Sequence, residues 1–552
     1  MERLLIIGGV AAGTKVAAKA KRENPDLEVT VLTREEYVSY AGCGLPYFIG
    51  DVIKDKNEII IKTPESLKKE LDINILTLHE VLKIIPEEKK VIAINKVNDE
   101  KVEIMYDKLV IATGASPVIP EIPGISLKRI FTLRTVSDAL VIKSLIDAGR
   151  VKRALIVGGG FIGLEMAENL YRRGIEVTII EHSKYILPGF DPEIALIAQK
   201  YLAKKGIKIL TEEKVISFNG NEKGEVTSVI TDKRSIETDF VLWSAGVKPN
   251  IELAKDAGIE IGETGAIRVN EYLETSIEDI YGVGDCVEMR HLITGKPVWY
   301  PMGSTANKMG RVAAINVAHS EKKEIFSGVL GTAIIKLFEL KAAKTGLTEK
   351  EALKEGYEVE TVLVPSNDLS HYYPGNKTII IKMIADRKTH RILGAQIIGE
   401  GVIDKPIDII VTAMSLKARI EDLAKMDFAY APPFSMAMSS VIVTSNVMLN
   451  KLYGKLHGIS PMQLKDKLEE DIQILDTRSE AEFVVSSIPN SINIPFDQLR
   501  HRALELDKEK ETVIVCKIGK RAYLAYITLK KLGFKNIKIL DGGITAYPFD
   551  LV

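Results

Sequence analysis

Short apolar runs that end in glycines and continue into helical repeats recur along this chain. Near its start, residues 3–7 are apolar, residues 8–13 read Gly-Gly-Val-Ala-Ala-Gly, and residues 14–22 have a helical pattern. The apolar run predicts a buried strand, and the glycines predict a tight turn into a helix. Strand, glycine turn and helix in this order are typical of a unit that binds a dinucleotide.

A second copy of this pattern occupies residues 154–165. It contains the full G-x-G-x-x-G arrangement, and the next apolar run, residues 177–180, ends in Glu181 at the spacing of a residue that bonds the adenosine ribose. A carboxylate there favours an unphosphorylated ribose and hence NADH, whereas the nearby His182 and Lys184 leave NADPH open. Two such turns in series predict two dinucleotide-binding domains.

The first copy departs from the full pattern in two places. Val10 stands where a second glycine usually lets the backbone approach a pyrophosphate. The next predicted strand leads to Thr33 instead of an acidic residue, and Glu35 and Glu36 are the nearest carboxylates that can take its place. The first turn is therefore a less complete match than the second.

One cysteine stands alone in a segment about thirty residues after the first turn. Residues 39–46 read Ser-Tyr-Ala-Gly-Cys-Gly-Leu-Pro, and Cys43 has no second cysteine near it. The glycines and proline suit a loop that lies against a ligand, where a thiolate of low pKa is a strong nucleophile. Without a Cys-x-x-Cys partner it cannot store electrons as a local disulfide, so it is expected to pair with a sulfur that a substrate brings. A buried, inert cysteine is the alternative.

Two further strand ends connect these turns to a known family. Residues 107–115 end in Ala-Thr-Gly-Ala, and residues 280–285 end in Gly-Asp. Segments of this kind, in this order, resemble the flavoprotein disulfide reductases with two dinucleotide-binding domains. The resemblance implies FAD in the first domain, NAD(P)H in the second, and a hydrogen bond between Asp285 and the ribityl chain of FAD. Cys286, directly after it, is predicted to be a bystander.

The segment around Cys43 resembles the single-cysteine branch of that family, which comprises coenzyme A-disulfide reductases, NADH oxidases, NADH peroxidases, and persulfide or polysulfide reductases. One thiol beside a flavin can cycle between a thiolate and a mixed disulfide, persulfide or sulfenate. Four later segments resemble the dimerisation domain of the coenzyme A-disulfide reductases, which implies a homodimer: residues 344–348, 371–375, 394–396 and 429–434.

Two tyrosines in these segments are candidate partners of the reactive cysteine. In that branch two tyrosines of the partner subunit reach the cysteine site, and spacing assigns the role to Tyr372 and Tyr430. A phenol can donate a proton to a leaving thiolate or stabilise it. Packing at the dimer interface is the alternative, because tyrosine is common at interfaces.

Coenzyme A is the substrate or cofactor that the resemblance implies near the first helix and the cysteine loop. Lys15, Lys19 and Arg22 share one helix face, which suits the phosphates of such a ligand. A solvated helix face is the alternative. The residue before the cysteine is commonly Asn but is Gly42 here, and Met438 replaces a lysine that is common in the branch, so coenzyme A is expected to bind differently or weakly.

The last part of the chain has the pattern of a separate small α/β domain. Residues 472–478, 491–495, 513–516 and 537–543 predict four short strands with helices between them. Cys516 ends the third strand and opens a helix, so backbone N–H groups are expected to point at its sulfur, with positive charge from Lys517, Lys520 and Arg521. The domain resembles rhodaneses, although residues 486–490 depart from the usual turn sequence. A catalytically inactive rhodanese module is the alternative.

Length and charge limit the remaining possibilities. The 552 residues are too many for one hydrophobic core, and a net charge of −1 with 27% charged residues gives no bias toward nucleic acid or membrane surfaces. Three cysteines are too few for a disulfide scaffold, which favours a cytoplasmic chain that acts on small molecules. No stretch is long and apolar enough to span a bilayer, and no metal site is predicted.

The predicted fold class is α/β, with two Rossmann-like domains, an α+β dimerisation domain and a rhodanese-like α/β domain. The domain ranges are residues 1–115 with 255–324 for FAD, 116–254 for NAD(P)H, 325–450 for dimerisation, 451–465 as a linker, and 466–552 for the rhodanese-like domain.

The resulting hypothesis is an FAD-dependent enzyme that uses NADH or NADPH to reduce a persulfide, a polysulfide or coenzyme A disulfide through Cys43, with sulfane sulfur carried by Cys516. One alternative is an NADH oxidase or peroxidase that cycles Cys43 through a sulfenic acid, and another is a non-enzymatic redox sensor or sulfur carrier. The candidate catalytic residues are Cys43, Cys516, Tyr372, Tyr430 and Arg521, and the coenzyme A candidates are Lys15, Lys19, Arg22, Ser39 and Cys43. The dinucleotide candidates are Gly8, Val10, Ala11, Ala12, Gly13, Thr33, Arg34, Ser39, Thr113, Gly114, Gly158, Gly160, Phe161, Ile162, Gly163, Glu181, Gly246, Gly284 and Asp285.

Overall fold

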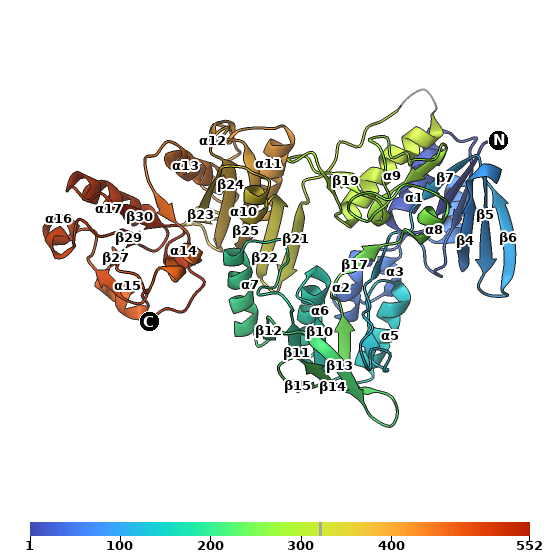
Figure 1. Ribbon diagram of the computed structural model, residues 1–552, viewed down its shortest axis with the longest axis horizontal. Coiled ribbons are helices and arrows are strands. Elements are labelled where there is room, and N and C mark those ends of the chain that lie inside the picture. The colour runs from blue at the N-terminus through green and yellow to red at the C-terminus, as the bar shows by residue number, and fades with distance from the viewer. Residues whose placement is uncertain (320–322) are drawn as a thin grey trace. The chain divides into compact units, whose positions relative to one another are not determined.

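A computed structural model describes residues 1–319 and 323–552 of the protein. The chain forms two compact units, residues 1–184 with 207–329 and residues 185–206 with 330–552, and many of their elements are labelled in Figure 1. Among the described residues, no helix is both long enough and apolar enough to cross a membrane.

The first unit contains a five-stranded parallel sheet whose central strand is the first apolar run of the sequence. β1 (Arg3–Ile7) pairs with β2 and β7, and its last four residues are buried. Helix α1 (Ala11–Glu23) follows the glycine turn and packs against α9 (Gly303–Ala318), with small alanines buried on both helices. The predicted strand, turn and helix are confirmed. The sheet order is β18 (Ile280–Gly282), β7 (Lys108–Ile111), β1, β2 (Glu28–Leu32) and β3 (Ile73–Leu76).

A second parallel sheet in the same unit repeats this arrangement around the second glycine turn. β10 (Arg153–Val157) leads through the turn into α6 (Phe161–Arg172), and the sheet order is β12 (Lys208–Leu210), β11 (Glu176–Ile180), β10, β16 (Phe240–Trp243) and β9 (Ile130–Phe131). The antiparallel strands are β4 (His79–Ile85), β5 (Lys90–Asn95), β6 (Glu100–Met105), β13 (Val215–Gly220), β14 (Val226–Thr231), β15 (Ser235–Glu237), β8 (Ala115–Pro117), β17 (Val247–Pro249), β19 (Met289–Arg290) and β20 (Pro297–Val298). The other helices of the unit are η1 (Gly42–Gly44), α2 (Leu45–Ile49), α3 (Lys56–Ile59), α4 (Pro64–Leu71), η2 (Pro86–Glu88), α5 (Val136–Asp147), α8 (Glu252–Asp256) and η3 (Gly284–Cys286).

The second unit contains a five-stranded antiparallel sheet in which two of the three inner strands are almost fully buried. Lys382, on one of these strands, is 2% exposed and meets three carboxylates, Asp191, Glu193 and Glu349, at 3.3, 3.1 and 2.8 Å. A charge buried this deeply is tolerated because it is paired. The sheet order is β21 (Ala333–Leu337), β22 (Leu340–Gly346), β25 (Ile392–Gly399), β24 (Thr378–Asp386) and β23 (Val359–Asn367), and its helices are α7 (Pro192–Lys204), α10 (Glu349–Lys354), α11 (Asp404–Ser415), α12 (Ile420–Ala424) and α13 (Ser440–Leu452).

The C-terminal sheet has five parallel strands, one more than the four predicted. The additional strand is β26 (Gly458–Ile459), which lies inside the stretch predicted as a linker, as does most of α14 (Pro461–Asp466). Two strand residues are too few to give an alternating pattern, so the sequence did not indicate this strand. The order is β26, β30 (Ile537–Leu540), β29 (Thr512–Val515), β27 (Gln473–Asp476) and β28 (Ser491–Asn493), and the helices are α15 (Glu480–Val485), α16 (Leu499–Arg502), η4 (Ala503–Glu505), α17 (Lys520–Lys531) and η5 (Ile544–Ala546).

A buried ion pair joins the C-terminal sheet to the antiparallel sheet. Lys451, at the end of α13, lies 2.6 Å from Asp541 and donates to the backbone oxygen of Thr361 at 2.7 Å. Burial raises the pKa of Asp541 to about 6, against the opposing effect of Lys451. The two sheets of the second unit are therefore joined by more than the chain between them.

We expect Lys451→Met to destabilise the full chain by about 3 kcal/mol at pH 8, because it leaves a buried carboxylate without its cation. The loss should be smaller below pH 6, where Asp541 becomes protonated in both proteins. Guanidinium unfolding at the two pH values measures it. Lys455→Met, at an exposed position of the same segment, is the control, and equal midpoints for both variants would contradict the prediction.

Candidate active sites

The lone cysteine of the first unit lies at the surface on a single 3-10 turn. Cys43 is in η1, and α2 begins two residues later with Pro46 in its first turn, which suits a helix start. Ser39, just before the turn, has φ of 47° and donates its backbone N–H to the oxygen of Gly9 at 2.8 Å. This bond joins the cysteine segment to the first glycine turn, so Cys43 is exposed and next to a candidate nucleotide site.

The side chains around Cys43 together do not lower its pKa, although the sequence predicts a thiolate of low pKa. Partial desolvation of the thiol raises the pKa of Cys43, the carboxylates of Glu165 and Asp285 raise it further, and Arg134 lowers it. The lowered pKa expected for a reactive thiolate is therefore not provided by these side chains. Desolvation of the thiol is the main cause, and two acidic residues that are far away in sequence add to it.

Helix α2 packs directly on α6, the helix that follows the second glycine turn. The Tyr47 hydroxyl donates to Glu165 Oε1 at 3.4 Å, and Gly50 lies so close to Asn169 that an added Cβ would be 2.1 Å from Asn169 Oδ1. Tyr47 and Glu165 were not predicted as site residues, because nothing local in the sequence indicates that residues 118 positions apart are bonded.

The first glycine turn has the shape that a dinucleotide requires. Gly8 has φ of 118°, and a Cβ there would lie 2.1 Å from the backbone oxygen of Ala112. The turn therefore brings β1 and β7 close together and aims the N-terminus of α1 outward, where a pyrophosphate binds. Val10 is the N-cap of this helix, and Thr33 is buried at the end of β2. Arg34 pairs with Glu35 and Glu80, at 3.4 and 3.8 Å.

The two strand ends named from the sequence lie in this unit as well. Asp285 in η3 accepts a hydrogen bond from Arg134 Nη2 at 3.0 Å, and Thr113 exchanges hydrogen bonds with Asn250. Cys286 is fully buried, and its sulfur contacts the backbone oxygens of Val283 and Ile111. These residues fit a bound FAD, because an acidic group and two glycine-containing turns face the same edge of one parallel sheet.

The second glycine turn leaves open space at the N-terminus of α6. A Cβ at Gly160, the N-cap, would meet nothing within 4 Å. Glu181, at the end of β11, accepts hydrogen bonds from the backbone N–H groups of Gly159 at 2.8 Å and Ser183 at 2.7 Å. The carboxylate is thus held beside the turn, where it fits the two ribose hydroxyls of NADH and repels a ribose phosphate. Gly158 belongs to the same glycine turn, Phe161, Ile162 and Gly163 form the start of α6, and Gly246 follows β16 with φ of 106°.

We expect Glu181→Gln to raise the ratio of kcat/KM for NADPH to that for NADH by about tenfold, because the variant keeps a hydrogen-bond acceptor and loses the negative charge. Steady-state kinetics with each cofactor measure the ratio. Glu176→Gln, at the exposed start of the same strand, should leave it unchanged. An unchanged ratio in Glu181→Gln would contradict the role of this carboxylate.

The basic face predicted on α1 is only partly available for a ligand. Lys19 forms an ion pair with Glu23, and His319 Nε2 approaches the same carboxylate at 3.1 Å. Lys15 and Arg22 form no ion pair within the described part of the chain. Lys15 and Arg22 are therefore better placed to contact a phosphate than Lys19 is.

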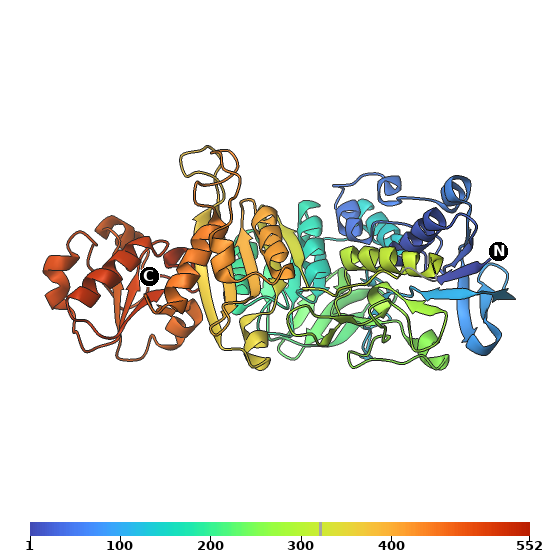
Figure 2. The ribbon, with the colours of Figure 1, turned by 90° about the horizontal axis from the view of Figure 1, so that it is seen from above.

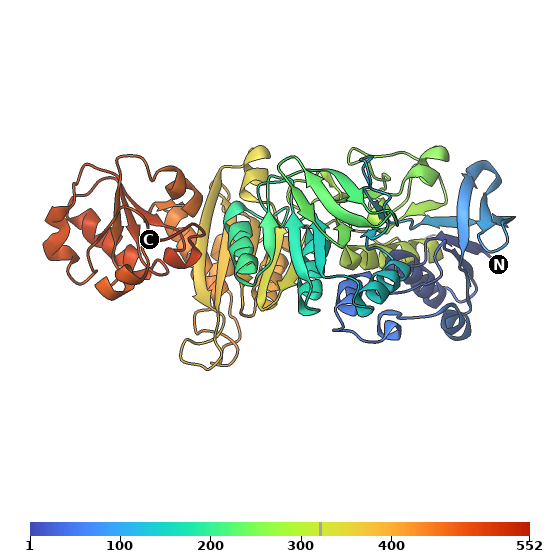
Figure 3. The ribbon, with the colours of Figure 1, turned by 90° about the horizontal axis from the view of Figure 1, so that it is seen from below.

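The two candidate tyrosines of the second unit lie together. Tyr372 is 63% exposed, Tyr430 is 49% exposed, and their hydroxyl oxygens are 3.5 Å apart. Their hydrogen bond lowers the pKa of Tyr372 and raises that of Tyr430. Phe434 and Met438, near Tyr430 in sequence, are also exposed. The loops beside the antiparallel sheet project outward in Figures 2 and 3. Such exposed aromatic loops are suited to contact a second chain.

Cys516 is enclosed at the N-terminus of a helix, as the sequence predicts. Its sulfur accepts hydrogen bonds from the backbone N–H groups of Gly519 at 3.1 Å and Ala522 at 3.3 Å, and the residue is 1% exposed. Backbone N–H groups and the positive end of α17 favour a negative sulfur here.

One of the three cations predicted near Cys516, Arg521, is paired with a carboxylate. Arg521 is bound by both oxygens of Glu482, at 2.6 and 2.7 Å, so its positive charge is largely balanced. The ion pair lowers the pKa of Glu482 to about 2. Lys517 and Lys520 are exposed and remain the cations at the mouth of the loop.

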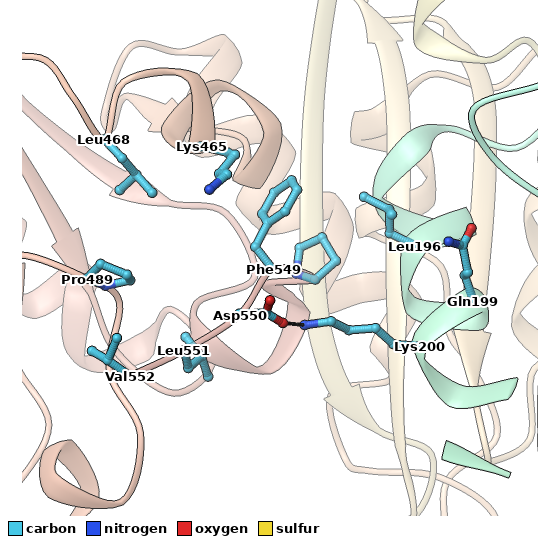
Figure 4. Close-up of a pocket in the computed structure, with 11 residues that line it drawn as sticks. Leu196, Gln199, Lys200, Lys465, Leu468, Pro489, Phe549, Asp550, Leu551 and Val552 are labelled. Atoms are coloured by element: carbon cyan, nitrogen blue, oxygen red, sulfur yellow. Dashed lines mark ion pairs between the residues drawn. The ribbon is translucent and has the colours of Figure 1, made fainter. Parts of the chain in front are cut away.

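A cavity of about 450 Å³ lies within the second unit. Figure 4 shows it between α7 and the end of the chain, where Lys200 and Asp550 form an ion pair of 3.0 Å. Leu196, Phe549 and Leu551 line it, and no cysteine does. It is therefore not assigned to the sulfur chemistry.

Comparison with known proteins establishes the family. Residues 2–321 match the pyridine nucleotide-disulphide oxidoreductase family, residues 332–441 match its dimerisation domain, and residues 460–548 match the rhodanese-like domain. The chain belongs to the pyridine nucleotide-disulphide oxidoreductase family and carries a rhodanese-like domain. The resemblance and the fold class predicted from the sequence are confirmed.

Three similar proteins illustrate the range of activities in this family. The NAD(P)H sulfur oxidoreductase (CoA-dependent) of Pyrococcus furiosus is 40% identical over 81% of this chain and 99% of its own length. An NADH oxidase of Methanocaldococcus jannaschii is 40% identical over 82% of this chain and its whole length. The structure of an NAD-dependent persulfide reductase from A. fulgidus has a TM-score of 0.94 and 38% identity, and covers 99% of this chain and all of its own.

Proposed function

We propose that the protein is an FAD-containing, NAD(P)H-dependent reductase of sulfur–sulfur bonds in persulfides, polysulfides or coenzyme A disulfide. The observation that carries the proposal is the exposed Cys43 on a turn whose following helix packs on the nucleotide-turn helix α6. The similar sulfur and persulfide reductases support this substrate class.

Bound FAD would supply the capacity to accept a hydride from NAD(P)H and to return an electron pair to a sulfur–sulfur bond. The residues that would hold it are those of the first glycine turn, together with Thr113, Gly114 and Asp285. Gly160 and Glu181 would hold the NADH.

The protein's own nucleophile is the Cys43 sulfur. Its thiolate attacks one sulfur of the substrate, a new S–S bond forms to Cys43, and the other sulfur leaves as a thiolate. Tyr372 and Tyr430 of a partner subunit are proposed to donate a proton to that leaving group, since their hydroxyls are exposed on dimerisation loops. This role requires a homodimer.

Cys516 is proposed to carry sulfane sulfur as a persulfide that its backbone N–H groups stabilise. Lys15 and Arg22 are proposed to contact phosphates of coenzyme A, and the three unpaired cysteines are consistent with a cytoplasmic setting.

Anaerobic oxidation of NADH with polysulfide, coenzyme A persulfide or coenzyme A disulfide tests the proposal. We expect turnover with at least one of these to exceed turnover with oxygen or hydrogen peroxide. The NADH oxidase activity of one relative makes the second measurement necessary. Faster turnover with oxygen or peroxide would replace the proposed function with an oxidase or peroxidase that cycles Cys43 through a sulfenic acid.

A further inference from the structure

The short turn between β30 and η5 contacts both the Cys516 loop and the antiparallel sheet. On the loop side, Ile544 donates its backbone N–H to the Cys516 oxygen at 3.0 Å, and Thr545 donates to the Lys517 oxygen at 3.1 Å. The elements involved all belong to the second compact unit. These two hydrogen bonds fix the peptide groups that follow Cys516 and Lys517, and the proposed function has so far given them no role.

The orientation of these two peptide groups decides where their N–H groups point. In a planar trans peptide the N–H points opposite to the C=O, so the N–H groups of Lys517 and Ile518 point away from η5. Neither donates a hydrogen bond within the described part of the chain. They are therefore available to a sulfur atom bound to Cys516, whose Sγ already accepts from Gly519 and Ala522 at 3.1 and 3.3 Å.

The other end of the turn is held by a residue that lies outside the rhodanese-like range, 460–548. Asp541, at the start of the turn, accepts from Lys451 Nζ at 2.6 Å, and Lys451 also donates to the Thr361 oxygen on β23 at 2.7 Å. Both charged side chains are buried. Gly458 covers the pair, because a Cβ there would lie 2.4 Å from Lys451 Nζ and 2.7 Å from Asp541 Oδ1.

The residues between these two sets of contacts are glycines in a left-handed conformation. Gly542 has φ of 75° and Gly543 has φ of 55°. Glycine restricts its own backbone less than any other residue, so the position of this turn depends on the contacts of its neighbours. Gly542 also rests on β23, since an added Cβ would lie 3.3 Å from Leu363 Cδ2. A change at Asp541 therefore reaches the Cys516 loop through a short stretch of backbone.

We propose that Lys451 is a positioning residue for the sulfurtransferase site, because through Asp541 it fixes the turn before η5 and so holds the Cys516 loop in the geometry that binds a persulfide. Glu360, the other carboxylate near Lys451, is 3.6 Å away and pairs with Arg387 at 2.6 Å, so Asp541 is the carboxylate that relies on Lys451. The inference rests on the proposed role of Cys516 as a sulfur carrier. The site is then completed by α13, a helix that precedes the rhodanese-like range.

Sulfur uptake from thiosulfate provides a defined reaction for the test. The Cys516 thiolate attacks the outer sulfur of thiosulfate, the S–S bond of thiosulfate breaks, a new S–S bond forms to Cys516, and sulfite leaves with the bonding electron pair. Charge and electrons balance without a proton or another reactant. The position of this equilibrium measures how well the loop stabilises the persulfide relative to the thiolate.

The full-length protein with FAD is equilibrated under argon at fixed ratios of thiosulfate to sulfite, and peptide mass spectrometry gives the fraction of Cys516 that carries an added sulfur. In Lys451→Met we expect the ratio needed for half-loading to rise by about fivefold, because displaced N–H groups bond a charged sulfur less well. Asp541→Asn should raise it by a similar factor. Unfolded molecules lower the maximal loaded fraction and leave the half-loading ratio in place, so the two readouts separate positioning from stability.

The double variant Lys451→Met/Asp541→Asn tests whether Lys451 acts through Asp541. If the two side chains act as a pair, the double variant should shift the half-loading ratio no further than the larger single shift. Ile410→Ala is the matched control for stability. It removes a fully buried side chain from α11, which packs on β22 and β25 of the same sheet, and it should destabilise the protein without changing the ratio.

Three results would overturn the inference: a wild-type ratio in Lys451→Met, an equal shift in Ile410→Ala, or additive shifts in the double variant. If the wild-type protein took up no sulfur on Cys516, both the proposed sulfur-carrier role and this inference would be wrong. If the wild-type protein loads and Lys451→Met loads at the same ratio, the sulfur-carrier role stands and the inference alone is wrong.

Discussion

Replacing Cys43 with serine should abolish NAD(P)H-dependent reduction of polysulfide and coenzyme A disulfide, with a fall in kcat of roughly three orders of magnitude or more. Serine keeps the shape of the turn but cannot form an S–S bond. Because Cys43 is exposed and packs into no core, the variant should fold normally. Steady-state NADH oxidation under anaerobic conditions measures the loss.

The same Cys43→Ser protein should retain its FAD and should still be reduced by one equivalent of NADH, since the glycine turns and Glu181 are unchanged. Cys286→Ser is the matched control. That sulfur is buried against backbone oxygens, a contact that a hydroxyl can keep, and its turnover should stay within about threefold of wild type. Substantial sulfur–sulfur reduction by Cys43→Ser would exclude Cys43 as the nucleophile.

Cys516→Ser should remove the sulfur-transfer activity of Cys516 and leave the disulfide-reductase activity of Cys43. We expect it to lose sulfur transfer from thiosulfate to cyanide by roughly three orders of magnitude, because a hydroxyl cannot carry a sulfane sulfur. Reduction of coenzyme A disulfide should stay within about twofold, because that reaction needs only Cys43. A coupled assay of thiocyanate formation and NADH oxidation on the same preparation measures both.

The reciprocal pattern should hold for Cys43→Ser, which is expected to keep thiosulfate sulfurtransferase activity. If both variants lost both activities, the two cysteines would act in a single obligatory sequence. If wild type itself showed no sulfur transfer, the rhodanese-like domain would be catalytically inactive in spite of the two N–H groups that face its sulfur.

The local part of the fold was predictable because glycine turns and apolar runs are read over a few residues. β1, α1, β10 and α6 begin and end within a few residues of the expected positions. Strand β26 could not be predicted, because two residues carry no periodic signal. Its partner strand β30 lies about eighty residues later in the chain. Nothing local indicated that residues 185–206 belong to the second compact unit.

The site was predictable to the extent that its chemistry lies in single residues. Cys43, Cys516 and Glu181 stand in recognisable local sequences, and the structure places each at a turn or helix terminus. The charged residues that change the pKa or the charge of the site residues could not be predicted, because they come from segments far away in the sequence. Glu165 acts on Cys43, Glu482 balances Arg521, and Glu23 binds Lys19.

The turn that follows β30 has a consequence for work on the C-terminal domain by itself. Asp541 binds Lys451, and two residues later Gly543 lies so close to the Cys516 loop that a Cβ would be 2.2 Å from the Cys516 oxygen. A fragment that starts after Leu452 would contain this turn with an uncompensated carboxylate and without the helix against which it is held. Sulfurtransferase activity measured on such an excised domain would understate that of the full-length protein, and a fragment that begins upstream of α13 is the better starting point.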